Sequence, residues 1–392
     1  MTDAATEGDA PRGYPVVGMV GGGQLARMTQ QAAIPLGVGF SVLSAGPRDS
    51  AALVVPDTMI GDPDDPEALA AFGRRCDVVT FDHEQVPQAG LAALATTGAQ
   101  IRPSAEALAH AQDKIVMRQA LTAMGAPCPR WLEWGPTSTM AHVAAQVGWP
   151  VVVKTSRGGY DGRGVWVAPD EEALRDVLSI PLAPGARWLL EEYVPFTAEL
   201  SAQVARSPHG QAVAYPVVRT LQQDGICKEV VAPAPGLPDD VAVAAQELAL
   251  RIAGELGVVG MLAVEMFLTD RGVLVNELAM RPHNSGHWSI EGAVTSQFEN
   301  HLRAVLDLPL GSPTPVAPYA VMVNVLGGDH PDMYLAYRHC MARDPGLHIH
   351  MYGKEVRPGR KIGHVTVVGD DPDELLARAR HAADYLTGVI QE

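Results

Sequence analysis

The sequence predicts an α/β region followed by an α+β region, with a parallel sheet in the first and an antiparallel sheet in the second. From residue 14 to about residue 111, apolar strand-like runs alternate with helix-like segments, which is typical of a parallel sheet with helices on its faces. From residue 113 onward, strand-like runs follow one another across turns, as in an antiparallel sheet. A short β-containing segment and a final helix complete the chain.

The N-terminal region carries the alternating pattern. Its expected strands are residues 16–20, 40–44 and 77–81. Its expected helices are residues 23–37, 65–76 and 88–98. Before them, residues 1–13 are small, acidic and proline-containing without an apolar stretch, so we expect a disordered leader rather than a signal peptide.

The second region begins at Asp113, which we expect to cap a helix over residues 114–125. Strand-like runs then cover residues 149–156, 164–169, 188–194, 200–206 and 213–218. A helix over residues 241–257 and a hairpin over residues 260–280 follow.

The proline-rich residues 311–318 resemble a linker, and a helix over 371–388 with Asp371 as its N-cap ends the pattern. We therefore expect four parts: the leader at 1–13, a domain at 14–112, a second domain at 113–310 and a small C-terminal domain at 311–392. A length of 392 residues suits two or three packed domains.

The composition excludes several classes of function. A net charge of −16 argues against nucleic acids and anionic membranes as partners, because phosphate attraction needs a surplus of Lys and Arg. No apolar run approaches the ~18 residues of a membrane span. The four cysteines lie far apart with no zinc-ligand spacing, which favours a reduced compartment, so we expect a cytoplasmic protein.

The first glycine-rich loop follows the first expected strand. Gly21, Gly23 and Ala26 give the spacing G-x-G-x-x-A, which is typical of dinucleotide sites. Such a site also needs an acidic residue at the end of the second strand, but that strand ends in residues 44–46, Ser-Ala-Gly. NAD binding is therefore disfavoured against a plain strand-to-helix turn or an anion bound at the helix N-terminus beside Gln24.

A second glycine-rich loop, residues 156–164, joins two strand-like runs. It lacks the Walker A pattern, yet a glycine-rich hairpin can close over phosphates with its backbone N–H groups. Lys154 precedes the loop and is placed to reach the same phosphates. The alternative is a flexible hairpin with incidental charges, although Tyr160, Asp161 and Arg163 give it more chemistry than a turn needs.

Two glutamates of the expected hairpin should face each other. If residues 270–272 form a three-residue loop, Thr269 pairs with Val273 and Glu265 lies opposite Glu277. Facing carboxylates destabilise a sheet unless a cation lies between them, and magnesium carried by nucleotide phosphates fits oxygen ligands. A two- or four-residue loop would set Glu265 against Asn276 instead, and solvated edge charges are the alternative.

Two later motifs gather cations and polar groups. In RPHNSGH, residues 281–287, the histidine spacing suits zinc poorly, and the motif reads instead as a polar cluster for an anion, made of Arg281, His283, Asn284 and Ser285. GKEVRPGRKIGH, residues 353–364, concentrates five basic side chains: Lys354, Arg357, Arg360, Lys361 and His364. A solvated charge run is the alternative for this second motif.

Taken together, these stretches resemble one family. The order GGGQLARM, FDHEQVP, DK, KTSRGGYDGRG, EEYVPFTAELS, YPVVRTLQQDGI, VEMF, NELAMRPHNSGH and GRKIGH is similar to that of N5-carboxyaminoimidazole ribonucleotide synthetases. The resemblance covers residues 15 to about 368. It implies an ATP-grasp fold with an N-terminal Rossmann-like domain, a central ATP-grasp domain and a small β-rich C-terminal domain.

The resemblance also implies roles for individual residues. The expected ATP ligands are Arg102, Lys114, Lys154, Gly159, Tyr160, Asp161, Gly162, Arg163, Gly164, Val165, Glu191, Glu192, Tyr193, Val194, Glu199, Asn276 and Glu277. The expected ribonucleotide ligands are Gln24, Glu84, Tyr160, Asp161, Arg163, Arg281, His283, Asn284, Lys354, Arg360 and Lys361. Magnesium is expected on Glu265 and Glu277, and the expected catalytic residues are Tyr160, Asp161, Arg163, Arg281 and His283.

The activity that the resemblance implies is carboxylation of 5-aminoimidazole ribonucleotide with ATP and bicarbonate, through carboxyphosphate, by a homodimer. One departure stands out: where the family often has E-N-x-H, this chain has residues 219–222, Arg-Thr-Leu-Gln, so Gln222 replaces a histidine. Rival activities are a formate-using glycinamide ribonucleotide transformylase, an NAD-dependent oxidoreductase and a silent nucleotide-binding protein. The presence of Lys154, Glu265 and Glu277 argues against the last.

Overall fold

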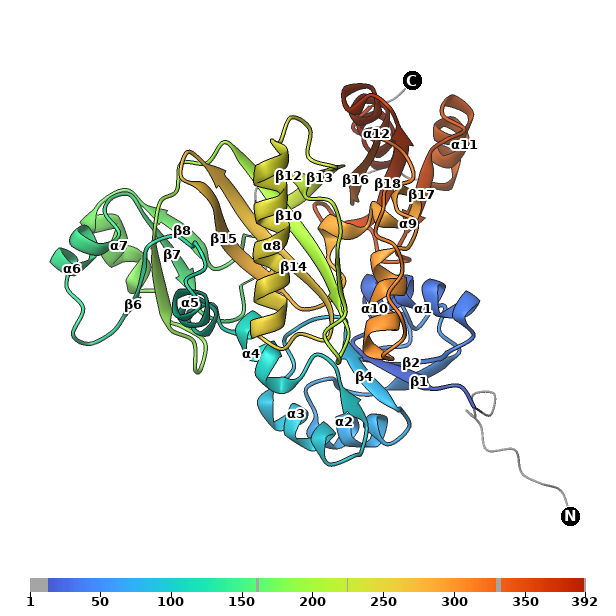
Figure 1. Cartoon of the computed structure of the whole chain (residues 1–392), viewed down its shortest axis with the longest axis horizontal. Helices are drawn as coiled ribbons and strands as arrows, with labels where there is room; N and C mark the ends of the chain where they lie inside the picture. The colour runs from blue at the N-terminus through green and yellow to red at the C-terminus, as the bar shows by residue number, and fades with distance from the viewer. Residues whose placement is uncertain (1–12, 160–161, 224, 329–332, 391–392) are drawn as a thin grey trace, which may run out of the picture.

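The computed structural model of the chain describes residues 13–159, 162–223, 225–328 and 333–390 (Figure 1). The N-terminal α/β unit packs below the centre of the molecule in Figure 1, a small sheet with its helices lies to the left, and the C-terminal strands and helices rise at the right. A large antiparallel sheet crossed by one long helix, α8 (Asp239–Glu255), occupies the middle.

The N-terminal unit is a parallel sheet, as the sequence predicts. Within residues 13–112 its strand order is β3-β2-β1-β4-β5, and every neighbouring pair is parallel. The strands are β1 (Val16–Val20), β2 (Gly39–Ser44), β3 (Asp57–Ile60), β4 (Val78–Phe81) and β5 (Gln100–Ile101). The helices are α1 (Gln24–Leu36), α2 (Pro66–Gly73), α3 (Gln88–Ala95) and α4 (Ala105–Gln112). The short edge strands β3 and β5 were not predicted, since neither shows a long apolar run.

A small antiparallel sheet follows the helix α5 (Lys114–Ala123). The Asp113 carboxylate accepts the N–H of Ile115 at 2.9 Å, which confirms the predicted cap. The sheet order is β6-β9-β7-β8, with β6 (Trp131–Trp134), β7 (Val151–Thr155), β8 (Val165–Ala168) and β9 (Trp188–Glu192). The helices α6 (Met140–Gln146) and α7 (Glu171–Leu178) accompany it.

The large sheet joins the middle of the chain to its C-terminus. Among the described residues it runs β15-β14-β10-β12-β13-β16-β18-β17, and β11 pairs with β10. Its central strands are β10 (Ala198–Arg206), β11 (Ala212–Ala214), β12 (Val218–Gln223), β13 (Ile226–Ala232), β14 (Gly260–Thr269) and β15 (Gly272–Ala279). Its C-terminal strands are β16 (Tyr319–Leu326), β17 (His348–Met351) and β18 (Lys361–Gly369).

The predicted strand over residues 213–218 is wrong as one element. The chain leaves the sheet between β11 and β12, because Pro216 has no N–H to donate to a ladder. The Tyr215 side chain is buried at this break, and its hydroxyl donates to the Thr295 carbonyl at 2.9 Å.

Helices cover the remaining surfaces of the large sheet and its neighbours. The turn η1 (Asn284–Gly286) and the helices α9 (Ser289–Gly292) and α10 (Gln297–Val305) follow β15. The helices α11 (Met333–Arg343) and α12 (Pro372–Thr387) pack with the C-terminal strands, and Asp371 caps α12 as predicted. Among the described residues, no helix is long and apolar enough to cross a membrane.

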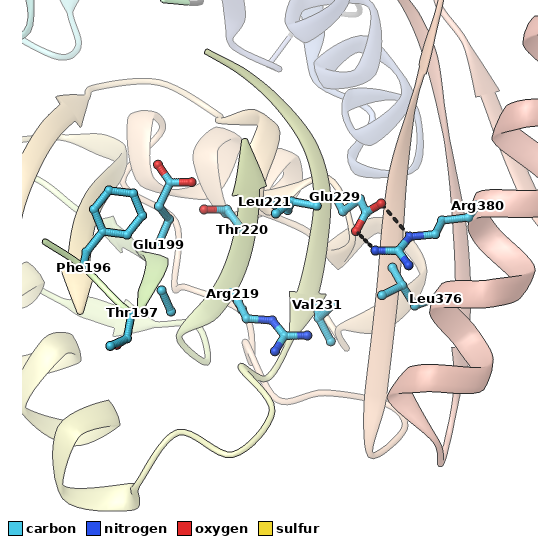
Figure 2. Close-up of a pocket in the computed structure, with 11 residues that line it drawn as sticks. Phe196, Thr197, Glu199, Arg219, Thr220, Leu221, Glu229, Val231, Leu376 and Arg380 are labelled. Carbon is cyan, nitrogen blue, oxygen red and sulfur yellow. Dashed lines mark hydrogen bonds and ion pairs between the residues drawn. The ribbon is translucent and has the colours of Figure 1, made fainter. Parts of the chain in front are cut away.

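An ion pair fastens α12 to the central sheet. Glu229 of β13 is 4% exposed, and its two carboxylate oxygens each accept a hydrogen bond of 2.7 Å from the Arg380 guanidinium (Figure 2). These hydrogen bonds raise the pKa of Arg380. The pair therefore ties the last helix to the central sheet.

Arg380→Ala is expected to lower the free energy of unfolding by roughly 2–3 kcal/mol, because it leaves the buried Glu229 carboxylate without its ion-pair partner. Since the Arg380 side chain is half-exposed, the loss should be smaller than that of a fully buried pair. Urea denaturation of the full-length protein measures it. Arg175→Ala is the matched control, since the Arg175–Glu171 pair is exposed, and should cost about 0.5 kcal/mol or less. Equal losses from the two variants would contradict this account.

Candidate active site

The two glutamates of the β14–β15 hairpin lie opposite each other, as predicted, but a different loop length and a bulge set the register of the two strands. The loop has two residues rather than three, since Thr269 pairs with Gly272, and the predicted Thr269–Val273 pairing is wrong. A bulge at Asn276 then shifts the register by one, so that Glu265 pairs with Glu277 after all. The extra residue also turns the Asn276 amide toward Lys154, whose Nζ donates to its Oδ1 at 3.0 Å.

The facing glutamates differ in charge environment. Burial, followed by the nearby Glu277 and Glu199 carboxylates, raises the pKa of Glu265 from 4.5 to about 7. Burial also acts to raise the pKa of Glu277, but the ion pair with Lys114 overcomes it and the pKa is lowered. Among the described residues, Glu265 is thus the carboxylate of the pair without an ion pair to a Lys or Arg side chain.

This arrangement fits a magnesium ion that arrives with a nucleotide. Magnesium is usually held by one or two carboxylates together with substrate phosphates rather than by an all-protein cage. Among the described residues there is no group of three or more His, Cys, Asp or Glu side chains that could hold a metal. The Glu265–Glu277 pair supplies two oxygen ligands, and the remaining ligands would come from phosphate and water.

The raised pKa of Glu265 predicts how the stability of the protein without metal or nucleotide depends on pH. A carboxyl whose pKa is raised on folding loses stability as pH rises from its unfolded pKa through about 7. Glu265→Gln removes that titration, so its melting temperature should match wild type near pH 4 and exceed it at pH 8, where the variant should be more stable by roughly 1–3 kcal/mol in free energy of unfolding. Calorimetry in EDTA measures the difference.

Glu277→Gln is the comparison for that experiment. It loses the ion pair with Lys114, so it should be less stable than wild type at pH 8. A pH-independent difference between Glu265→Gln and wild type would show that Glu265 does not titrate in this range.

Beside the glutamates lies a buried cluster around Glu191. Lys154 Nζ is 2.7 Å from one Glu191 oxygen, and the Arg118 Nε donates to the other. Burial alone would raise the pKa of Glu191, but Arg118 and Lys154 lower it to about 2. Arg118 also donates to the carbonyls of Val275, at 3.1 Å, and Asn276, at 2.8 Å.

Arg118 was not predicted from the sequence. It follows Lys114 by four residues, so both project from one face of α5, and that spacing was the available signal. Its side chain is fully buried, and its contacts hold the bulged strand and Glu191 together. Lys114 and Lys154 then lie on the same side of the glutamate pair, where two ammonium groups suit phosphates.

The other expected ATP residues are spread along the neighbouring strands. Glu199 is half-buried, and this desolvation raises its pKa; the backbone N–H of Gln222 partly offsets the rise by donating to the carboxylate at 3.3 Å. Gln222, which replaces the family histidine, thus contacts Glu199 through a backbone group that any residue provides. Glu192 is held by Arg130 and Arg271, away from Lys154. The Arg102 guanidinium donates to the Val305 carbonyl at 2.7 Å.

The remaining ATP candidates belong to two chain segments. Tyr193 is half-exposed and Val194 is buried, directly after β9. In the second glycine-rich loop, Tyr160 and Asp161 lie outside the described residues, and Arg163 is exposed. Gly164 has a φ of +76°, and a Cβ there would lie 2.5 Å from the Thr155 hydroxyl, so this position requires glycine. Gly159, Gly162 and Val165 complete the segment.

Residues 219–221 of the stretch that departs from the family pattern line a cavity of about 290 Å³ between the sheet and α12 (Figure 2), whereas Gln222 is not among its lining residues. Its walls include Glu199, Arg219, Thr220, Leu221, Leu376 and Arg380. Figure 2 shows the Glu199 carboxylate and the Arg219 guanidinium pointing in different directions from neighbouring strands. The departure at residues 219–222 therefore lies beside the expected ribose ligand rather than among the glutamates and lysines.

The first glycine loop holds a carboxylate of the chain itself. The Asp82 side chain accepts the N–H of Ala26 at the start of α1, at 2.8 Å, and burial raises the Asp82 pKa. A Cβ on Gly23 would lie 2.0 Å from an Asp82 oxygen, so glycine is required here for this contact. Asp82 thus takes up the N–H of Ala26, and the external anion beside Gln24 stays a prediction.

The expected ribonucleotide residues come from three parts of the chain. The Arg281 guanidinium donates to Glu84 at 2.7 Å; burial lowers the Arg281 pKa, but Glu84 outweighs it and raises it. Lys354 donates to the Gln24 side chain, which joins the C-terminal cations to the first glycine loop. Asn284 exchanges two hydrogen bonds with Asn324 of β16, which fix its side chain, and its contact with the ribonucleotide stays a prediction.

His283 connects these residues to the glutamates. Its Nε2 lies 3.5 Å from a Glu265 oxygen. Burial, with Arg281 and Lys361 nearby, lowers the His283 pKa well below its ordinary value, so the ring is neutral. Lys361 lies close enough to Glu265 to act on its pKa, whereas the exposed Arg360 donates to the Glu355 carbonyl at 3.3 Å.

Comparison with known proteins matches three families along the chain. A ribonucleotide synthetase preATP-grasp domain matches residues 15–112, an ATP-grasp domain residues 119–298, and a phosphoribosylaminoimidazole carboxylase C-terminal domain residues 320–378. N5-carboxyaminoimidazole ribonucleotide synthase from Mycobacterium tuberculosis is 54% identical over 377 residues, which cover 95% of this chain and 88% of that protein. The chain belongs to the N5-carboxyaminoimidazole ribonucleotide synthase family.

Solved structures of this synthase family agree. The Thermus thermophilus N5-carboxyaminoimidazole ribonucleotide synthetase superposes with a TM-score of 0.84 at 36% identity, covering 96% of this chain and 99% of that one. The Aspergillus clavatus synthase, in complex with ADP and 5-aminoimidazole ribonucleotide, gives 0.85 at 31% identity, covering 95% and 98%. The resemblance and the ATP-grasp fold predicted from the sequence are both confirmed.

Proposed function

We propose that this chain carboxylates 5-aminoimidazole ribonucleotide to N5-carboxyaminoimidazole ribonucleotide in purine biosynthesis, using ATP and bicarbonate and releasing ADP and phosphate. It is an ATP-dependent carbon–nitrogen ligase. The observation that carries the proposal is the junction at Glu265: the Glu277–Lys114–Lys154 cluster lies on one side and Arg281, His283 and Lys361 on the other. Phosphoryl transfer and anion binding can therefore meet at one place.

The ATP side of the site is assigned first. Lys114 and Lys154 contact the phosphates, and Glu199 takes the ribose hydroxyls. The backbone of Glu191 to Val194 faces adenine, while the Glu191 side chain holds Lys154 in place. Glu265 and Glu277 would hold magnesium together with ATP, and the ion would supply charge neutralisation to the phosphates.

The reaction needs two bond exchanges. A bicarbonate oxygen attacks the γ-phosphorus and ADP leaves, giving carboxyphosphate; its carbon, directly or as carbon dioxide, then bonds the exocyclic amine as phosphate departs and the amine loses a proton. The chain orients these partners through Lys154, Arg281 and His283. We assign to the glycine-rich segment 156–164 the role of excluding water, which would protect the short-lived intermediate.

The ribonucleotide side uses a local group of cations in a chain whose net charge is −16. Arg281, oriented by Glu84, together with Lys354, Arg360 and Lys361, neutralises the phosphate, and Gln24 borders the site. Tyr160, Asp161 and Arg163 are assigned to the covering loop. We also propose domain boundaries near residues 112 and 310, a cytoplasmic homodimer, and a reduced state for the four cysteines, none of which forms a disulfide in the structure.

Phosphate release from ATP tests the activity. Turnover should require magnesium, bicarbonate and 5-aminoimidazole ribonucleotide together, with the carboxylated product detected at low temperature. Efficient turnover with formate and glycinamide ribonucleotide, and none with bicarbonate and 5-aminoimidazole ribonucleotide, would overturn the proposal in favour of the transformylase alternative.

A further inference from the structure

Behind His283 lies a buried network that has no assigned role. The Ser285 hydroxyl is 2.7 Å from His283 Nδ1 and 2.8 Å from the Ser201 hydroxyl. The Gln203 amide nitrogen donates to both hydroxyls, at 2.7 Å to Ser285 and 3.0 Å to Ser201. Ser201 and Ser285 are fully buried and Gln203 is 1% exposed, so water does not compete for these bonds.

Counting donors fixes the direction of the network. A hydroxyl carries one hydrogen and two acceptor sites. If Ser201 donates to Ser285 and Ser285 donates to His283 Nδ1, every hydroxyl hydrogen has an acceptor. If Nδ1 instead carried the ring proton, Ser285 would donate to Ser201, and the Ser201 hydrogen would have no acceptor among the hydrogen bonds of the described residues.

The backbone supports the same direction. The Ser285 N–H points at His283 Nδ1, at 3.4 Å, where the imidazole caps the short turn η1. A protonated Nδ1 would set two N–H groups against each other. The Gln203 oxygen has no hydrogen-bond partner among the described residues in this arrangement. Turning the amide over would leave its NH₂ group unpaired instead, and a buried unpaired donor is rarer than an unpaired carbonyl.

We propose that Ser285, oriented by Gln203 and Ser201, holds His283 in the tautomer that carries its proton on Nε2. That nitrogen lies 3.5 Å from Glu265, at the junction of the phosphate and ribonucleotide sides. His283 then offers a neutral hydrogen-bond donor to an oxygen of bicarbonate or of the transferred group. Ser285 is a positioning residue, and the role of the donor rests on the proposed function.

The tautomer can be measured without activity. In full-length protein labelled with ¹⁵N-histidine, two-bond ¹H–¹⁵N correlations distinguish the tautomers, and His283→Asn identifies the signal. Wild type should show the proton on Nε2, and Ser285→Ala should show a mixture. If wild type carries the proton on Nδ1, the proposal is overturned. This test needs only the wild-type protein, so it holds even if the Ser285 variant does not fold.

Kinetics separate positioning from packing. Ser285→Ala should lower kcat about tenfold or more, as loss of a partner that orients a histidine does, with the KM for ATP changed less than about twofold. Ser201→Ala is the matched control: it deletes the same group from the same buried network without touching His283, and should lower kcat less than about threefold. Equal losses in kcat would mean that the network only supports packing. A protein with the expected tautomer but no carboxylation would instead reject the proposed function alone.

Discussion

Glu277→Gln should lower kcat by about a thousandfold or more, a loss of roughly 4 kcal/mol in transition-state stabilisation. The substitution keeps the shape of the side chain but removes one of the two carboxylates that face each other across β14 and β15. It also frees Lys114 from its ion pair, so an ammonium meant for phosphate is no longer held in place. Turnover measured against magnesium concentration should show little rescue at high magnesium.

The control for this variant is a glutamate of similar chemistry outside the site. Glu133 is exposed and pairs with Arg187 at 3.0 Å, so Glu133→Gln should change kcat less than about twofold. Near-normal turnover by Glu277→Gln together with a large loss of stability would mean that the facing glutamates are structural, and the magnesium assignment would be wrong.

Arg281→Ala should raise the KM for 5-aminoimidazole ribonucleotide at least tenfold, a loss of ~1.4 kcal/mol or more, while the KM for ATP changes much less. In a chain of charge −16 a phosphate dianion needs local cations, and Arg281 is one that is already oriented, by Glu84. Lys361→Ala should act in the same direction, and Lys361→Glu should be worse because it adds repulsion.

Removing Arg281 also leaves the buried Glu84 carboxylate without its partner. The double variant Glu84→Gln/Arg281→Ala separates that penalty from the lost substrate contact, and its ribonucleotide KM should stay raised. Arg357→Ala is the control, because that exposed side chain pairs with Glu355 and should leave both KM values within about twofold. A rise in the KM for ATP alone would show that Arg281 binds ATP rather than the ribonucleotide.

Local patterns in the sequence predicted much of the fold. The alternation of apolar strands and helices in the first domain depends on neighbouring residues only, and β1, β2, β4 and α1 lie where it places them. Caps are similarly local, so Asp113 and Asp371 were both found. The break at Pro216 was missed because the apolar residues around it outweighed one missing N–H.

The contacts of the candidate site could not be predicted from local sequence patterns alone. The Glu265–Glu277 pair was predicted from a three-residue loop that does not exist, and the bulge at Asn276 restored the register. No spacing in the sequence encodes that bulge, since it is held by Arg118, more than a hundred residues earlier in the chain. The contacts of Asp82 with α1 and of Gln203 with Ser285 are also long-range, and only the fold brings them together.

The measurement that tests the central claim most directly follows oxygen from bicarbonate. If bicarbonate attacks the γ-phosphorus of ATP, the attacking oxygen stays on phosphorus when carboxyphosphate breaks down. Turnover with ¹⁸O-bicarbonate and 5-aminoimidazole ribonucleotide, over a time short against oxygen exchange with water, should therefore release phosphate carrying one ¹⁸O for each carboxylated product. Release of unlabelled phosphate alongside that product would contradict the account, because bicarbonate would then not be the phosphoryl acceptor.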